Sequence, residues 1–254
     1  ISEWIDDGEV DLLNRLCVPL PIYVIADQLG VPRSELTLLK KWSDASTSRL
    51  GRLADEEQQI QNAKDIVEFQ HYFADLIDRM REHPEDNIIS DLANNTIDEG
   101  RLLTKPEALG MIQQILVAGN ETSTNAIAGG VVLLIENPEE QAKLRANPDL
   151  IPTAVEEILR LETPTSGMWR RATQDTEIDG VAIPEGSFLM VRFAAGNRDE
   201  SVFPCAGAMQ VDRENADNHM AFGQGTHFCL GAQLARTELQ IAMTTLLRRT
   251  DKDR

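Results

Sequence analysis

The sequence predicts a mainly α-helical fold with a minor β region, and the spacing of its apolar residues is the reason. In the first two-thirds of the chain, apolar residues recur at the period of an α-helix. Over residues 176–197 the pattern changes to short alternating runs separated by Gly180, Pro184 and Gly186, which is typical of small strands and turns. The helical period then returns over residues 231–249.

The length and charge of the chain argue against several classes of protein. With 254 residues, 42% of them hydrophobic, and no repeats or obvious linker, we expect a single domain over residues 1–254. The net charge of −18 argues against a nucleic-acid partner, because phosphate binding requires clustered Lys and Arg. The longest apolar run, residues 126–135, is too short to span a bilayer. Cys17, Cys205 and Cys229 are odd in number and far apart, which suits a reducing compartment and predicts a cytoplasmic protein.

The longest predicted helix covers residues 106–136. Thr104 and Glu107 have the spacing of a capping box, and Pro106 suits the first helical turn. From its number of residues this helix would be roughly 45 Å long, which is enough to cross the core of a domain. Apolar residues lie nearly all round it, so we expect packing partners on every side.

Within this helix, the stretch AGNETST (residues 118–124) places Gly119 within one turn of Glu121 and Thr122. The Thr122 hydroxyl could bond the carbonyl of Ala118 and open the helix locally. An acid and an alcohol beside a gap in side-chain cover can relay protons to a bound small molecule. The alternative is a packing patch of small residues with a solvated glutamate.

Two shorter helices are predicted next, over residues 137–147 and 151–162, the second of which is stopped by Pro164. In the second helix, Glu157 and Arg160 lie on one face and can form an ion pair. Most such pairs are exposed and contribute at most about 1 kcal/mol, so this pair alone indicates no function.

The stretch FGQGTHFCLGAQLAR (residues 222–236) surrounds Cys229 with Gly223, Gly225 and Gly231. Glycine permits left-handed backbone and lets a flat ligand approach without a Cβ in the way. Cys229 also precedes the start of the predicted helix at 231–249, where unpaired N–H groups favour the thiolate form that binds metals. The alternative is a small buried cysteine beside an ordinary helix-starting turn.

Taken together and in this order, these stretches closely resemble the cytochrome P450 family of haem-thiolate enzymes, nearest to its soluble bacterial members. The loop matches the family's F-x-x-G-x-x-x-C-x-G signature at Phe222, Gly225, Cys229 and Gly231. The long helix matches its A-G-x-[DE]-T motif at Ala118, Gly119, Glu121 and Thr122. The E-x-x-R motif is matched at Glu157 and Arg160.

The resemblance implies a long oxygen-binding helix over a haem held by the cysteine loop, with Cys229 as the metal ligand. It implies proton delivery by the catalytic residues Thr122 and Glu121, and room for dioxygen at Gly119. It implies a buried triad in which Arg213 joins Glu157 and Arg160, and a shield for the thiolate at Phe222. The residues expected to bind the cofactor are Ala118, Gly119, Thr122, Arg170, Phe222, Gly223, His227, Cys229, Leu230, Gly231 and Ala235, with Arg170 and His227 at the haem propionates.

The function that this resemblance implies is a haem-thiolate monooxygenase that inserts one atom of O2 into a small apolar organic substrate. Its cofactor would be haem b (iron protoporphyrin IX). Two electrons would come from NAD(P)H through a ferredoxin- or flavodoxin-type redox partner. The alternatives are a peroxide-driven or isomerising haem-thiolate enzyme, and a haem-binding fragment without turnover.

The chain also departs from the family pattern. Residues 205–207 read CAG where the family usually has Asp-Pro-Asp, which leaves the local turn open. The amino-terminal part of the family fold is missing, and the chain ends at residues 251–254, before the family's terminal strands. We therefore expect a cytochrome P450 domain that is incomplete at both ends and that binds haem weakly on its own.

Overall fold

The computed structural model describes residues 1–51, 55–97 and 100–250, so the chain end at 251–254 lies outside the described residues. The chain forms two compact units. We call Asp11–Thr124 the helical unit, and Ile1–Val10 together with Asn125–Arg254 the cysteine-loop unit. The boundary between them falls within the long helix α5 (Lys105–Glu136), after Thr124.

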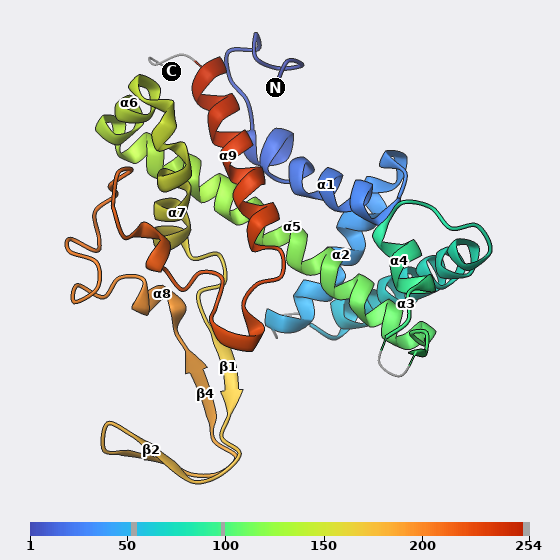
Figure 1. Cartoon of the computed structure of the whole chain (residues 1–254). Coiled ribbons are helices and arrows are strands. Elements are labelled where there is room, and N and C mark those ends of the chain that lie inside the picture. Colours follow the sequence, from blue (N-terminus) through green and yellow to red (C-terminus); the bar gives the residue numbers. More distant parts are fainter. Residues whose placement is uncertain (52–54, 98–99, 251–254) are drawn as a thin grey trace. The chain divides into compact units, whose positions relative to one another are not determined.

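The helical unit is built from the helices before α5 and the first part of α5 itself (Figure 1). Its core is a continuous set of buried apolar side chains around Trp42. The Trp42 ring meets Phe69 and Phe73 edge-on, with ring centroids 5.9 Å apart in both pairs. The elements are η1 (Leu13–Cys17), α1 (Pro19–Leu29), η2 (Arg33–Glu35), α2 (Leu36–Gly51), α3 (Glu56–Glu82) and α4 (Ile88–Asn94).

The start of α5 is fixed by the capping box that the sequence predicts. The backbone N–H of Thr104 donates to Glu107 Oε2 at 2.8 Å, and the N–H of Glu107 reaches Thr104 Oγ1 at 3.5 Å. Arg101 adds a bidentate ion pair to the same carboxylate. The helix runs from Lys105 to Glu136, so the predicted range of 106–136 is confirmed to within one residue.

The cysteine-loop unit contains the remaining helices and two small antiparallel ladders (Figure 1). In the first ladder β1 pairs with β4, and in the second β2 pairs with β3. The mainly helical fold with a minor β region is therefore confirmed. The elements are α6 (Pro138–Ala146), η4 (Pro148–Leu150), α7 (Ile151–Glu162), β1 (Met168–Arg171), β2 (Thr176–Ile178), β3 (Val181–Ile183), β4 (Phe188–Val191), α8 (Phe193–Gly196), η5 (Ala216–Asn218), η6 (Gly225–His227) and α9 (Ala232–Arg249).

Within this unit, α5 comes close to α7 and α9 at two adjacent glycines. A Cβ added at Gly130 of α5 would come within 2.9 Å of the Ile158 side chain on α7 and 3.0 Å of Met243 on α9. At neighbouring Gly129 it would collide with the Glu162 side chain. The absence of side chains at these glycines is therefore what lets the three helices approach one another.

The predicted triad is present and buried. Arg160 binds Glu157 through two hydrogen bonds of 2.7 and 2.8 Å, and Arg213 Nε lies 3.0 and 3.1 Å from the two oxygens of the same carboxylate. The arginines also donate to backbone carbonyls: Arg160 to Asn197 and Ala206, both at 2.7 Å, and Arg213 to other carbonyls of the same segment. The triad therefore ties the segment after α8 to α7.

The CAG stretch forms a local turn within this segment. Cys205 takes a left-handed backbone conformation with φ of 54°, and its carbonyl accepts the N–H of Ala208 at 2.9 Å. The turn thus closes without the family's usual residues.

Within the described ranges, no helix combines the length and the apolar character that crossing a bilayer requires.

The first prediction concerns the triad. Replacing Arg160 with Ala should lower the free energy of unfolding of the cysteine-loop unit by about 3–5 kcal/mol, because the buried Glu157 carboxylate loses one of its two cations. Denaturant unfolding of the purified variant measures this change. The matched control is Lys143→Ala, which removes an exposed cation 2.8 Å from the partly buried Glu140 and should cost at most about 1 kcal/mol. Equal effects of the two substitutions would contradict a structural role for the triad.

Candidate functional site

The loop that carries Cys229 is held by backbone hydrogen bonds within residues 222–232. The N–H of Cys229 donates to the carbonyl of Phe222 at 2.9 Å, and the N–H of Phe228 donates to that of Gly225 at 3.0 Å. The carbonyl of Cys229 in turn accepts the N–H of Ala232, the first residue of α9, at 3.3 Å. The Cys229 side chain is exposed at the surface of the unit. The alternative interpretation, a small buried cysteine, is therefore not what the structure shows.

The glycines of the loop leave space around it. Gly223 and Gly225 adopt the left-handed conformation, with φ of 70° and 71°, as the sequence predicts. A Cβ added at Gly225 or Gly231 would meet no other atom within 4 Å. Gly231 has an ordinary negative φ and acts as the N-cap of α9, where no side chain binds the first amides of the helix.

Apolar side chains stand out from the same loop. Leu230 is 98% exposed and Phe228 is 48% exposed, and Leu234 on the first turn of α9 is also exposed. A soft sulfur donor, open space above glycines and uncovered apolar side chains together fit a flat, apolar, iron-carrying group such as haem.

The residues expected at the haem propionates lie on two elements of this unit. Arg170 is on β1 and His227 is the last residue of η6, and both are exposed. Arg170 Nη1 donates to the carbonyl of Trp169 at 2.9 Å. Neither side chain forms an ion pair with a carboxylate of the described residues, so the Arg170 guanidinium and the His227 ring could both hydrogen-bond an anionic group. Ala235, one turn into α9, is half-buried.

The other expected residues belong to the helical unit, so how they lie relative to Cys229 stays a prediction. Thr122 Oγ1 donates to the carbonyl of Ala118 at 2.7 Å, as the sequence predicts, and α5 remains helical through this stretch. The Glu121 carboxylate lies 3.6 Å from Lys40 Nζ. Burial raises the pKa of Glu121 above its ordinary value, Lys40 opposes the shift, and Asp44 adds to it. A carboxyl group whose pKa is raised in this way keeps its proton to a higher pH than an exposed one.

The space beside Gly119 is filled on one side by a neighbouring helix. A Cβ at this position would collide with the Ile25 side chain of α1, so Ile25 packs against Gly119 in that direction. Room for dioxygen elsewhere beside Gly119 stays a prediction. Asn120 beside it is buried, and its Nδ2 donates to Ser43 Oγ at 3.1 Å. On the side where a Cβ would point, Gly119 therefore allows α1 to pack closely against α5. This agrees with the alternative interpretation of the stretch as a packing patch of small residues.

Glu156 is the centre of a cluster that was not predicted from the sequence. Arg236 donates to both oxygens of this carboxylate, from Nε at 2.7 Å and from Nη2 at 2.9 Å, and His219 Nε2 lies 3.1 Å from Oε2. The Arg236 guanidinium also lies over the Phe222 ring, 4.7 Å from its centroid. The sequence contains two signals for this cluster: a second glutamate directly before Glu157, and a histidine three residues before Phe222.

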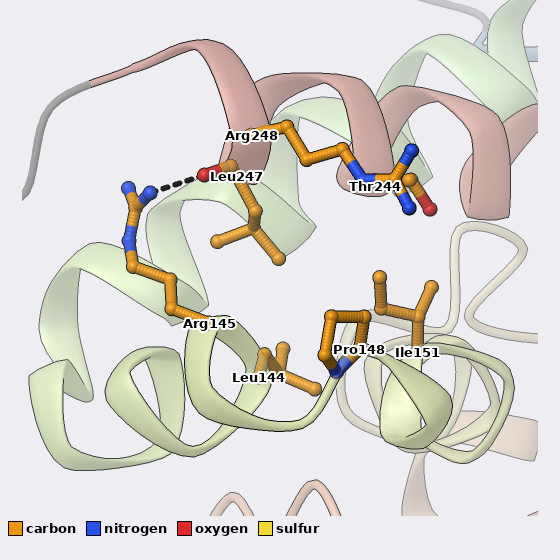
Figure 2. A pocket seen from close by; sticks show the side chains of 7 residues that line it. All are labelled: Leu144, Arg145, Pro148, Ile151, Thr244, Leu247 and Arg248. Atoms are coloured by element: carbon orange, nitrogen blue, oxygen red, sulfur yellow. Dashed lines mark hydrogen bonds between the residues drawn. The ribbon is translucent and has the colours of Figure 1, made fainter.

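A pocket of about 250 Å³ lies away from the cysteine loop, between α6, η4 and α9. Figure 2 shows Arg145 at its edge donating to the carbonyl of Leu247. Thr244 is the pocket residue nearest to the loop along α9, and it lies about 18 Å along the helix axis from Ala232. The pocket is therefore separate from the Cys229 site. Its lining residues are Leu144, Arg145, Pro148, Ile151, Thr244, Leu247 and Arg248.

Comparison with known proteins identifies one family. The family model described as cytochrome P450 matches residues 52–251. The cytochrome P450 monooxygenase PikC of Streptomyces venezuelae is 39% identical over 244 residues, which cover 96% of this chain and 57% of PikC. The steroid C26-monooxygenase of Mycolicibacterium smegmatis is 38% identical over 243 residues, which cover 95% of this chain and 60% of that protein.

A solved structure agrees with these matches. The crystal structure of P450BioI, in complex with an acyl carrier protein ligated to hexadec-9Z-enoic acid, matches with a TM-score of 0.91 and 35% identity. The match covers 98% of this chain and 63% of P450BioI. The chain thus spans about three fifths of the length of the relatives that it matches.

The second prediction concerns the Glu156 cluster. Burial alone would raise the pKa of Glu156, but the hydrogen bonds from His219 and Arg236 lower it from its ordinary value of 4.5 to about 2. The cluster therefore stabilises the fold above pH 4.5 and loses this contribution as the pH falls toward 2. Glu156→Gln should flatten the acid limb of the stability curve, measured by unfolding at a series of pH values. The control Glu185→Gln, in an exposed turn, should leave that limb unchanged, and an unchanged limb in Glu156→Gln would refute the assignment.

Proposed function

Because this chain belongs to the cytochrome P450 family, we propose that it carries the haem-binding part of a haem-thiolate monooxygenase. The reaction inserts one atom of O2 into an apolar organic substrate. The observation that carries this proposal is the exposed Cys229 in a loop whose glycines leave open space. Haem b would be the cofactor, and it would supply the redox-active iron for the reaction with dioxygen.

Cys229 provides the thiolate ligand, and the surrounding residues hold it. The Phe222 carbonyl fixes the Cys229 amide, and Gly223, Gly225 and Gly231 keep side chains out of the way of a flat ring. Leu230 supplies apolar surface for the ring to cover. The remaining cofactor residues of this unit are Arg170 and His227, which bind the propionates, and Ala235.

Thr122 and Glu121 would relay protons to the cofactor site, alongside Ala118 and Gly119 of the same helix. The Thr122 hydroxyl donates to the Ala118 carbonyl and keeps its oxygen free to accept a second hydrogen bond. The raised pKa of Glu121 suits a group that takes up a proton and releases it.

The substrate class and the electron donor complete the proposal. One relative is named as a steroid monooxygenase, and the P450BioI structure contains hexadec-9Z-enoic acid ligated to an acyl carrier protein. Steroids and long-chain fatty acids are both large and mostly apolar, which supports an apolar substrate for this chain. Electrons come from NAD(P)H through a ferredoxin- or flavodoxin-type partner. Four arginines, at positions 213, 236, 248 and 249, are candidates for docking an acidic electron donor. Arg213 and Arg236 are bound to glutamates. The exposed Arg248 and Arg249 are therefore the two that we propose for docking. Two further expectations from the sequence stay predictions: that the chain forms a single domain, and that the protein is cytoplasmic.

The third prediction tests the thiolate. In the haem-loaded protein, Cys229→His should abolish the red-shifted ferrous–CO absorption band of thiolate-bound haem, because imidazole replaces sulfur on the iron. The control is Cys205→Ser, which removes the other exposed cysteine and should keep the band. A Cys229→His variant that retains the band would eliminate Cys229 as the ligand.

The fourth prediction tests proton delivery. Thr122→Ala should continue to consume electrons but release more peroxide and less organic product, because protonation of bound oxygen is mistimed. The ratio of product to NAD(P)H consumed measures this coupling. Thr237→Ala is a matched control, since Thr237 makes the same bond to a helix carbonyl, that of Gln233 at 2.9 Å, but lies on α9. Equal coupling in the Thr122 variant and the wild type would exclude the relay.

A further inference from the structure

The Glu156 carboxylate joins the two ends of the segment that carries Cys229. His219 lies before Cys229 in the sequence and Arg236 lies after it, and both bind Glu156 on α7. His219 Nδ1 accepts the N–H of Ala221 at 3.1 Å, which leaves Nε2 to carry the proton and donate to Glu156. One carboxylate on a helix therefore holds both ends of the loop.

Arg236 extends this clamp to the residue that anchors Cys229. Its guanidinium is held in plane by two bonds to Glu156 and covers the face of Phe222 at 4.7 Å. The carbonyl of that same Phe222 accepts the Cys229 N–H at 2.9 Å. The cluster thus continues from α7 through Arg236 and Phe222 to the backbone of the cysteine.

The Glu156 cluster is distinct from the Glu157 triad. The triad binds carbonyls between Asn197 and Ala208, whereas the bonds of Glu156 go to side chains on either side of the Cys229 loop. Neighbouring glutamates of one helix therefore hold two different segments.

We propose that Glu156 and Arg236 are positioning residues for the Cys229 thiolate. They fix Phe222, and through its carbonyl the backbone of Cys229, so that the sulfur is presented to iron in one orientation. This inference rests on the proposed function, because it takes Cys229 to be the haem ligand. Neither side chain needs to touch the haem.

The test compares haem-loaded variants at one fixed pH. The ferrous–CO spectrum separates thiolate-bound from thiol-bound haem. It is compared only under conditions where the unfolding curve of each variant shows the protein fully folded, so that lost stability is not counted as lost positioning. Arg236→Met removes the fork and the cation over Phe222, while Arg236→Lys keeps the charge but loses the planar, bidentate geometry. Lys143→Met is the control, since it removes a cation from an exposed pair elsewhere in the unit.

The ratio of thiol-bound to thiolate-bound haem should rise in Arg236→Met, because loss of the fork leaves Phe222, and through its carbonyl the Cys229 backbone, without support. Arg236→Lys should show a smaller rise in the same direction, and Lys143→Met none. Glu156→Gln should resemble Arg236→Met. If Arg236→Met fails to fold, Arg236→Lys decides, together with hydrogen exchange of the Cys229 amide, which should become faster.

Wild-type ratios in both Arg236 variants would overturn the positioning role. The proposed function fails separately, when the wild-type protein itself lacks the thiolate band or when Cys229→His retains it.

Discussion

The fold of the cysteine-loop unit depends on one interaction, the binding of the Glu157 carboxylate by Arg160 and Arg213. All three side chains are removed from water, so the charges are stable only while each keeps its partners. The remaining donors of the arginines satisfy carbonyls of an irregular segment that has few ladder bonds of its own. A helix thereby organises a stretch of chain that would otherwise have no fixed course.

The order imposed by the triad reaches the cysteine loop through Asn197. Its carbonyl accepts a bond from Arg160, and its side chain bonds Thr163 Oγ1 at 2.8 Å and the N–H of Met220 at 2.6 Å. Met220 directly follows His219, which the neighbouring Glu156 binds. Two adjacent carboxylates on α7 therefore set the approach to Cys229, one through the backbone and one through side chains.

Local features of this structure were predictable from the sequence, and features that depend on distant partners were not. The capping box of α5 and the bond from Thr122 to Ala118 join residues three and four apart, so their spacing encodes them. The strand β1 was missed because its residues do not alternate in character, and only pairing with β4 makes it a strand.

Two packing contacts around the expected site residues could not be predicted for the same physical reason. Ile25 fills the space beside Gly119 from another helix, and no pattern around Gly119 indicates which side chain packs there. Glu156 meets Arg236 across 80 residues of sequence, so the cluster exists only once α7 and α9 are side by side. The loop signature, by contrast, identified Cys229 and its glycines because they are contiguous.

The adjacent glycines Gly129 and Gly130 have a consequence for how α5 folds. Each lowers the intrinsic helix propensity of α5 by about 1 kcal/mol relative to alanine, at the point where the helix packs most tightly. This part of α5 therefore gains its stability from contact with Ile158 and Met243 more than from its own sequence. We therefore expect helix formation at these glycines to depend on the docking of α7 and α9.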